Sequence, residues 1–205
     1  MNGQIYVVSG PSGVGKSTLV RKIRKELPDL GYSVSHTSRA PRTGEINGVD
    51  YHFVKKSRFQ SMINQGSFVE WEEIYNDLYG TAYVSLNDLL NHGSDMILDL
   101  DNKGAANIRR HYTESVMIYI LPPSMKELEK RLRARAQDTD NAIKLRIGKA
   151  REEIQNSLWY DFFIINDNPL KSLEDLKSII LSNRCRHKRM LSKVKEIIDN
   201  QGAQQ

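Results

Sequence analysis

The fold that we expect is decided by the stretch Gly10, Pro11, Ser12, Gly13, Val14, Gly15, Lys16 and Ser17. An apolar run at residues 5–8 precedes it, and residues 16–27 follow with apolar side chains at helical spacing. Between a strand and a helix, glycines let backbone N–H groups turn inward around an anion, and the positive end of the helix dipole adds to the attraction. The stretch fits G-x-x-x-x-G-K-[S/T] and predicts a site for nucleotide phosphates; the strand and helix beside it disfavour a chance glycine-rich turn.

Four side chains in and near this loop have predicted roles at the nucleotide. Lys16 can reach the β- and γ-phosphates, the hydroxyl of Ser17 can ligate Mg²⁺, and Thr18 completes the ATP-binding segment. The apolar stretch 96–101 ends in two acids, Asp99 and Asp101, and ligands of open α/β sheets collect at such strand ends, so Asp99 is a second candidate ligand of the metal, directly or through water. The alternative at this strand end is that Asp101 only caps the next helix.

Along the rest of the chain, short apolar runs alternate with helical patterns. Residues 96–100, 116–121 and 162–165 are such runs, and each precedes a helix-like segment. The alternation predicts an α/β fold of the P-loop NTPase type, with a parallel sheet and flanking helices. Two stretches interrupt it: 35–84 has short strand-like pieces near 51–54 and 68–71, and 126–157 is helical and highly charged. We therefore expect a core of 1–34, 85–125 and 158–205, with 35–84 as a substrate-binding insertion and 126–157 as a helical lid.

Composition excludes several classes of protein. The mean hydropathy is −0.54, and no apolar run reaches the ~18 residues that a membrane span needs. A single cysteine excludes a disulfide scaffold and a multi-thiolate zinc site. The N-terminus has no basic leader before its short apolar run, so a cytoplasmic protein without a membrane partner is expected.

The net charge of +5 comes from the C-terminal tail. Residues 184–195 have six Lys or Arg and no acid, so removing them from the net charge leaves −1. A solvated helix is our first interpretation of this tail; a subunit contact or an anion patch is the alternative, and monomer and homo-oligomer stay open. Because no basic groove interleaved with aromatic residues is present, we expect no nucleic-acid partner.

Arginines suggest a second phosphate site. Arg39 and Arg42 lie three apart in a turn held by Pro41, and arginines bind phosphate in bidentate fashion. The lid segment adds further arginines that could close over two phosphates and exclude water. They are Arg131, Arg133, Arg135, Arg146 and Arg151. The alternatives are solvated arginines and i,i+4 pairs such as Glu127 with Arg131. No Ser/His/Asp triad is evident, as expected if the acceptor is itself a phosphate.

These motifs, in this order, resemble the guanylate kinase family over about residues 4–182. Besides the loop, the resemblance rests on residues 35–45, 48–53, 68–71, 79–81, 98–101, 131–135 and 165–167. It implies transfer of the γ-phosphoryl group of ATP to GMP, and to dGMP, giving GDP and ADP in purine metabolism, with Mg²⁺.

The resemblance also implies roles for single residues. The GMP phosphate would be held by Arg39, Arg42, Tyr51 and Tyr79. Guanine O6 would be bound by Ser35 and Thr81, and its N1–H and 2-amino group by Glu70 and Asp101. Asn166 would lie near the ATP adenine. The catalytic set would comprise Lys16, Arg39 and the lid arginines Arg131, Arg135 and Arg146. Taken singly, without the family pattern, Tyr51, Tyr79, Glu70 and Asn166 would each be interpreted as structural residues in core, surface or turn positions.

The chain departs from the family pattern at three places. Asp77 brings an extra acid near the acceptor phosphate and is expected to weaken GMP binding. Asn102 and Lys103 stand where the family often has an aromatic residue or Met and then Gln. Ala136 replaces a glycine and is expected to stiffen a lid hinge.

Three competing functions stay open at this point. The first is a kinase of the same fold with another acceptor, which Ser35, Glu70, Thr81 and Asp101 disfavour. The second is a non-catalytic domain of guanylate-kinase type that binds proteins, which Lys16, Ser17 and the lid arginines disfavour. The third is a nucleic-acid-binding ATPase, suggested only by the high isoelectric point.

Overall fold

The structure is a computed structural model that describes residues 3–74, 76–84, 86, 90, 92–134 and 139–199. Its central sheet has five parallel strands in the order β2-β7-β1-β8-β9. They are β1 (Ile5–Ser9), β2 (Gly31–Tyr32), β7 (Met96–Asp99), β8 (Val116–Leu121) and β9 (Phe162–Ile165). The predicted α/β fold with a parallel sheet is confirmed, and the four apolar runs are four of its strands.

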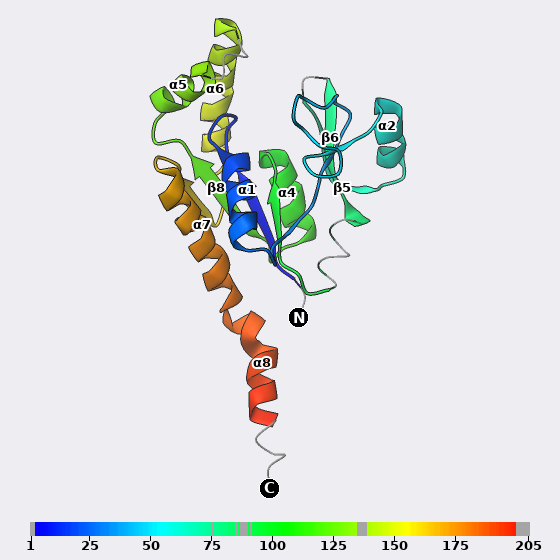
Figure 1. Ribbon diagram of the computed structural model, residues 1–205, viewed down its shortest axis with the longest axis vertical. Helices are drawn as coiled ribbons and strands as arrows, with labels where there is room; N and C mark the ends of the chain where they lie inside the picture. Colours follow the sequence, from blue (N-terminus) through cyan, green and yellow to red (C-terminus); the bar gives the residue numbers. More distant parts are fainter. Residues whose placement is uncertain are drawn as a thin grey trace.

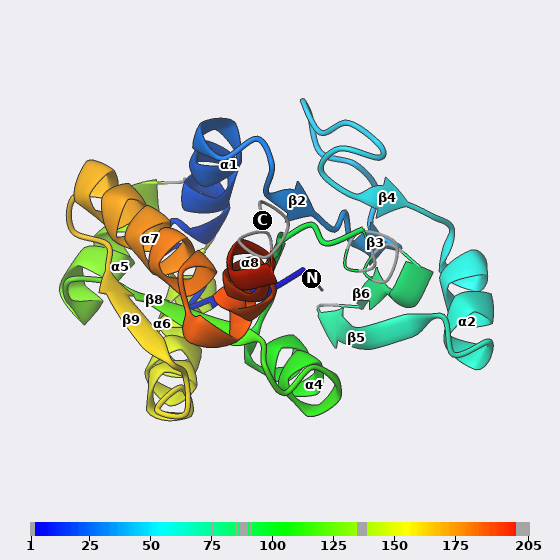
Figure 2. The same cartoon turned by 90° about the horizontal axis from the view of Figure 1, so that it is seen from below.

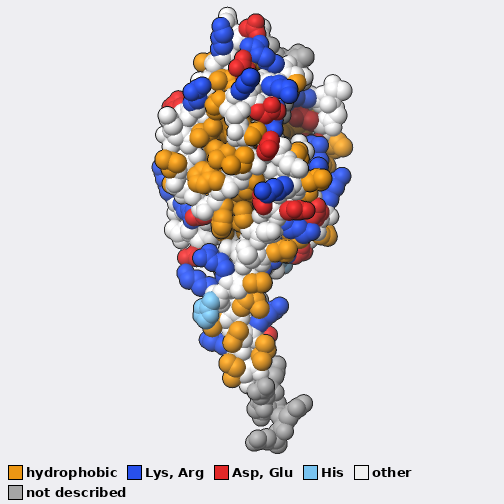
Figure 3. All heavy atoms as spheres, turned by 90° about the vertical axis from the view of Figure 1, so that its left-hand side faces the viewer, with side chains coloured by type: hydrophobic (Ala, Val, Ile, Leu, Met, Phe, Trp, Pro, Cys, Tyr) orange, Lys and Arg blue, Asp and Glu red, His pale blue; other side chains and the backbone are white. Residues whose placement is uncertain are grey.

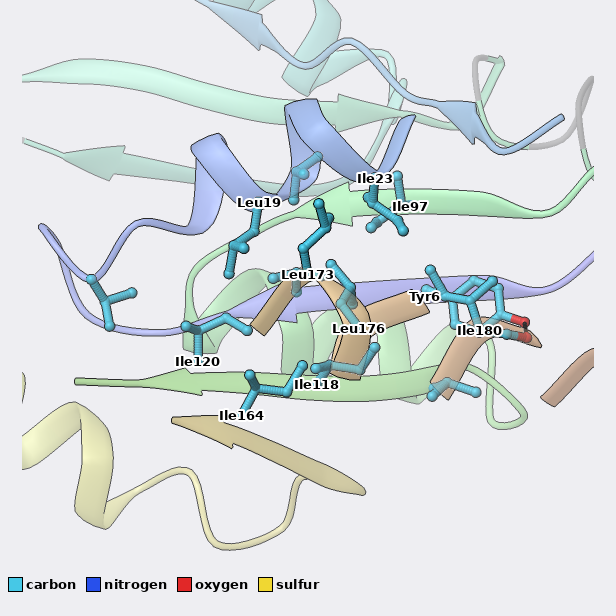
Figure 4. Close-up of a cluster of buried hydrophobic side chains, with 14 of the residues drawn as sticks. Tyr6, Leu19, Ile23, Ile97, Ile118, Ile120, Ile164, Leu173, Leu176 and Ile180 are labelled. Atoms are coloured by element: carbon cyan, nitrogen blue, oxygen red, sulfur yellow. Dashed lines mark hydrogen bonds between the residues drawn. The ribbon is translucent and has the colours of Figure 1, made fainter. Parts of the chain in front are cut away.

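Helices cover both faces of this sheet. Figure 2 shows α1 (Lys16–Glu26) and α7 (Pro169–Arg184) on one side and α4 (Asn102–His111) on the other. Because side chains alternate along a strand, Tyr6 and Val8 pack with the first pair of helices, whereas Val7 packs with α4. Figure 4 shows the first of these layers, in which side chains of β1, β7, β8 and β9 meet those of α1 and α7.

A second sheet lies beside the first and belongs to the predicted insertion. Its order is β4-β3-β6-β5, with β3 and β4 parallel and the other pairs antiparallel. Its elements are β3 (His36–Thr37), β4 (His52–Phe53), β5 (Phe68–Ile74), β6 (Asp77–Ala82) and the covering helix α2 (Lys56–Asn64). Phe59 and Met62 of α2 pack on Phe68, which gives this sheet a small core of its own. The strand expected at 51–54 is shorter, because Tyr51 forms an isolated bridge with Asn47.

Two helices form an arm on the opposite side of the P-loop from the second sheet. These are α5 (Met125–Ala134) and α6 (Asp140–Gln155), and Figure 1 shows them across the P-loop from β5 and β6. Leu128, Leu132 and Ile143 are buried in the same cluster as Val14 of the loop. The arm is therefore anchored by apolar contacts to the phosphate loop that it is predicted to cover.

The last helix, α8 (His187–Asp199), extends away from the body (Figure 1). Apolar side chains gather on it in Figure 3, and Leu191, Val194, Ile197 and Ile198 are exposed. The interpretation as a solvated helix is wrong for two of the six basic residues, because Arg184 and Arg189 both form ion pairs with the buried Asp95. Among the helices that the structure describes, none is long and apolar enough to cross a membrane.

Candidate active site

The phosphate loop has the backbone that its sequence predicts. Gly10, Gly13 and Gly15 all have positive φ, at 144°, 90° and 103°, which side chains disfavour. A Cβ atom on Gly15 would lie 2.6 Å from Nδ2 of Asn166, and one on Gly10 would lie 2.4 Å from the carbonyl oxygen of Ile120. Both conformation and space therefore require glycine here, and the loop opens directly into α1.

The polar side chains of the loop are held next to it. Lys16 donates from Nζ to the carbonyl oxygen of Gly10 at 2.7 Å, which folds the ammonium back over the loop. Ser17 donates from Oγ to Oδ2 of Asp99 at 2.8 Å. A hydroxyl and a carboxylate side by side are hard oxygen ligands of the kind that Mg²⁺ prefers. The two residues predicted to hold the metal are thus brought together and fit it chemically.

Asn166 joins the end of β9 to the phosphate loop. Its amide donates from Nδ2 to the carbonyl oxygen of Val14 at 2.7 Å, and the residue is buried. Its Oδ1 atom is also buried and has no hydrogen-bond partner among the described residues. An unsatisfied buried acceptor is costly, so this oxygen is suited to an amino group of a bound ligand, such as that of adenine.

The arginine turn is held by an acid that the sequence analysis had not assigned a role. Arg39 donates from Nη2 to Oε1 of Glu45 at 2.8 Å, and the backbone N–H of Arg42 donates to Oε2 at 2.7 Å. The hydrogen bond from Arg39 is the main reason that the pKa of Glu45 is lowered. The guanidinium lies 5.6 Å from the ring of Tyr51, which is edge-on to Tyr79. Three of the four predicted phosphate ligands therefore lie together, and Arg42 is exposed beside them.

Carboxylates gather where β5 faces the start of α4. Glu70 is buried, and burial raises its pKa to about 7 while Asp101 adds to the rise. Asp101 caps α4 by accepting from the N–H of Gly104 at 2.8 Å. A Cβ on Gly104 would lie 3.0 Å from Oε2 of Glu70 and 3.3 Å from Oδ1 of Asp101, so both acids flank the same glycine. Capping by Asp101 is confirmed and is compatible with ligand binding.

The two predicted ligands of guanine O6 also meet. Ser35 Oγ and Thr81 Oγ1 are 3.4 Å apart, and either can donate. Thr81 lies opposite Glu70 in the register of β5 and β6. The hydroxyl donors and the carboxylate acceptors expected for a guanine base thus lie close together, where the second sheet meets the start of α4.

The lid arginines are only partly defined. Arg131 donates from Nε to Oε1 of Glu127 at 3.2 Å, which confirms the predicted i,i+4 pair. The next residue, Leu132, would meet a Cβ on Gly13 at 2.7 Å, so this turn of α5 packs against the phosphate loop. Arg146 is half-buried on α6. Arg135 and Ala136 lie outside the described residues.

Charged groups in and beside the phosphate loop influence the pKa values of residues in the insertion and on α6. The pKa of Tyr51 in the insertion is raised to about 12, mainly by burial and next by the carboxylate of Asp99 beside the phosphate loop. On α6, burial raises the pKa of Glu153, whereas the positive charges of Lys149 and Lys16 oppose the rise. An acceptor phosphate at Tyr51 would therefore lie near the metal-binding pair.

Two of the departures from the family pattern have partners in the structure. Asn102 donates from Nδ2 to the carbonyl oxygen of Glu153 at 2.9 Å and accepts from the hydroxyl of Tyr160 at 3.0 Å. Lys103 donates from Nζ to Oε1 of Glu72 at 2.6 Å. Sequence reasoning gave Glu45, Glu72 and Glu153 no role. Only the spacing of Glu70 and Glu72, which predicts one face of a strand, could have indicated Glu72.

The phosphate loop is accompanied by a hydroxyl and carboxylate pair. It faces a second sheet with arginine, tyrosine and buried carboxylate side chains. This combination defines a P-loop phosphotransferase with a nucleotide acceptor. The model of the guanylate kinase family matches residues 2–183. The guanylate kinase of Geobacter metallireducens is 44% identical over 197 residues, which is 96% of this chain and 97% of that protein. That of Geobacter sulfurreducens is 45% identical over 195 residues, 95% of this chain and 96% of that protein. The chain belongs to the guanylate kinase family.

Solved structures agree with this assignment. The crystal structure of guanylate kinase from Anaplasma phagocytophilum superposes with a TM-score of 0.78 at 30% identity, covering 95% of this chain and 94% of that one. The resemblance inferred from the motifs is therefore confirmed over nearly the whole chain.

Proposed function

We propose that this chain transfers the γ-phosphoryl group of ATP to GMP, giving ADP and GDP, and that it also accepts dGMP, in purine nucleotide metabolism. Membership of the guanylate kinase family supports the reaction. The single observation that carries the choice of base is the buried carboxylate of Glu70 next to Asp101. Guanine has three donor hydrogens on N1 and its 2-amino group, whereas adenine has none at either position. Bound adenine would leave these buried acceptors unpaired, which costs about 1–3 kcal/mol for each group.

The acceptor needs positioning rather than activation. The attacking atom is a phosphate oxygen that is already anionic, so a protein base is unnecessary. Arg39, Arg42, Tyr51 and Tyr79 orient this phosphate, with Glu45 holding Arg39 in place. Holding two reactants in line removes much of the entropic barrier to their reaction.

Charge stabilisation comes from the donor side. Lys16 and the loop N–H groups neutralise the β- and γ-phosphates, and Ser17 with Asp99 would hold Mg²⁺, which would supply further positive charge to the phosphates. Arg131, Arg135 and Arg146 add positive charge from the lid and exclude water from the transferring group. Asn166 contacts the adenine of ATP.

The predicted division of the chain is part of the same proposal. Residues 35–84 bind GMP, 126–157 act as the lid, and 1–34, 85–125 and 158–205 form the core. The extra acid at Asp77 lies two residues before Tyr79 and is expected to weaken GMP binding. A cytoplasmic location and small-molecule substrates as the partners stay predictions, as do monomeric and homo-oligomeric states.

A panel of acceptors tests the proposal. The purified chain is incubated with ATP, Mg²⁺ and GMP, dGMP, AMP, CMP, UMP or dTMP, and ADP release is followed. Turnover confined to GMP and dGMP is expected. Comparable rates with AMP, or ADP release that no acceptor stimulates, would contradict it.

A further inference from the structure

Glu72 shares the face of β5 that contains Glu70. The two residues are two apart on the strand, so their side chains point the same way, whereas Trp71 and Glu73 between and after them are exposed on the other side. In the register with β6, Glu70 lies opposite Thr81 and Glu72 lies opposite Tyr79. Glu72 therefore lies next to both the base-binding and the phosphate-binding side chains of the proposed GMP site.

One oxygen of Glu72 is used and the other is not. Oε1 accepts from Nζ of Lys103 at 2.6 Å, and the side chain of Glu72 is only 18% exposed. Oε2 is buried and has no hydrogen-bond partner among the described residues. An acceptor left in this state costs free energy in the empty protein, and a ligand donor would recover it.

The charged groups around Glu72 indicate which kind of ligand donor its free oxygen Oε2 can accept. Glu70 lies on the same strand face, Asp101 and Lys103 approach from α4, and Tyr79 lies across the sheet. Burial raises the pKa of Glu72 to about 7, the nearby Asp101 carboxyl adds to the rise, and the Lys103 ammonium opposes it. A further anion would be repelled, so a neutral N–H donor fits the free oxygen. Asp101 already accepts a hydrogen bond at Oδ1 from the N–H of Gly104, which leaves it less able to accept one from a ligand.

We propose that Glu72 is a third carboxylate of the guanine site, that its Oε2 accepts a hydrogen from the 2-amino group, and that Lys103 is the residue that positions it. The inference rests on the proposed function. It gives each of the three guanine donor hydrogens a carboxylate acceptor, from Glu70, Glu72 and Asp101. It also gives a reason for Lys103, which departs from the family pattern at this position.

Inosine monophosphate, which is GMP without the 2-amino group, tests the assignment. KM and kcat are measured for GMP, dGMP and inosine monophosphate with the wild type and Glu72→Gln. We expect the KM for GMP and dGMP to rise about tenfold, the loss of one hydrogen bond to a charged acceptor, and that for inosine monophosphate to change less than about twofold. Glu73→Gln is the matched control, because Glu73 is on the opposite face and pairs only weakly with Lys56 at 3.6 Å.

Lys103 provides a second and independent arm. Lys103→Met is expected to raise the KM for GMP more than the KM for inosine monophosphate, and Lys103→Arg to restore the wild-type preference. A purely structural role would instead alter all three acceptors alike or lower the melting temperature without changing the preference.

Three results would overturn the inference. An equal rise of KM for GMP and inosine monophosphate would remove the 2-amino group as the partner of Glu72. A rise for GMP but not dGMP would assign Glu72 to the ribose 2′-hydroxyl. If Glu72→Gln has the same KM values as the wild type for all acceptors, Glu72 is not part of the guanine site. By contrast, wild-type protein that does not phosphorylate GMP would contradict the proposed function itself.

Discussion

The donor half and the acceptor half of this site are built by different means. The phosphate loop is one contiguous segment whose shape depends on glycines with positive φ and on backbone N–H groups. The acceptor half assembles side chains from distant segments, among them Arg39, Glu70 and Asp101, and concentrates buried acids in it. Backbone groups do not titrate, whereas buried carboxylates do. The first half should therefore tolerate changes of pH, and the second should respond to them.

The largest effect is expected in the donor half. Lys16→Ala removes the one loop ammonium that can reach the phosphates, so kcat should fall about 10³-fold, as when a preorganised charge is removed from a reaction centre. Steady-state ADP release measures it. Lys25→Ala, on the far turn of the same helix and exposed, is the control and should retain wild-type kcat. Equal loss in both variants would mean that α1, and not the ammonium, is responsible.

The next effect separates the halves by affinity. Glu70→Gln keeps the size of the side chain but removes its charge, so the KM for GMP should rise about 10- to 100-fold while the KM for ATP stays within about twofold. Glu73→Gln on the outer face is again the control. A change of similar size in the KM for ATP would show that Glu70 supports the whole site and does not recognise the base.

The same substitution should stabilise the empty protein. The pKa of Glu70 is raised by burial to about 7, above its ordinary value, so the folded protein favours the protonated acid. Stability is therefore lost as pH rises from about 4.5 to about 7 and stays lost above it. Glu70→Gln should gain on the order of 2 kcal/mol at pH 8 and little at pH 4.5. Thermal melts of the unliganded variant and wild type at the two pH values measure it; equal differences at both would refute it.

The smallest effect concerns the residue that holds the arginine turn. Glu45→Gln keeps the length of the side chain but weakens its charge-assisted bond to Arg39, so the KM for GMP should rise about threefold with kcat nearly unchanged. Measurement of the GMP concentration dependence at saturating ATP checks this. An unchanged KM would mean that Tyr51 and the backbone suffice to place the guanidinium.

Sequence reasoning predicted the donor half better than the acceptor half, for physical reasons. The loop, Ser17 and Asp99 follow from local spacing and from the strand ends, and the structure brings the two metal candidates within 2.8 Å. The strands at 5–8, 96–100, 116–121 and 162–165 follow from contiguous apolar runs. The acceptor half depends on tertiary contacts between segments. Its two arginines, Arg39 and Arg42, were predicted from their spacing, whereas its tyrosines and base ligands were found only through the family resemblance.

The sequence did not reveal the roles of acids whose partners are distant in the chain. Glu72 meets Lys103 across 31 residues, and Arg184 and Arg189 meet Asp95 across about 90. No local pattern encodes such pairs. The prediction that the basic tail is a solvated helix was therefore wrong in part, because two of its charges anchor α7 and α8 to the body.

The pH dependence of the two Michaelis constants tests most directly the difference between the halves. KM values for GMP and ATP are measured from pH 6 to 9 in the wild type and in Glu70→Gln, so that ionisation of the substrates is common to both proteins. We expect the wild-type KM for GMP to rise below about pH 7, the pKa to which burial raises Glu70, and this rise to be smaller in the variant, where Glu72, whose pKa burial also raises to about 7, remains. The KM for ATP should follow the same course in both proteins. A GMP profile that is identical in wild type and Glu70→Gln would contradict it.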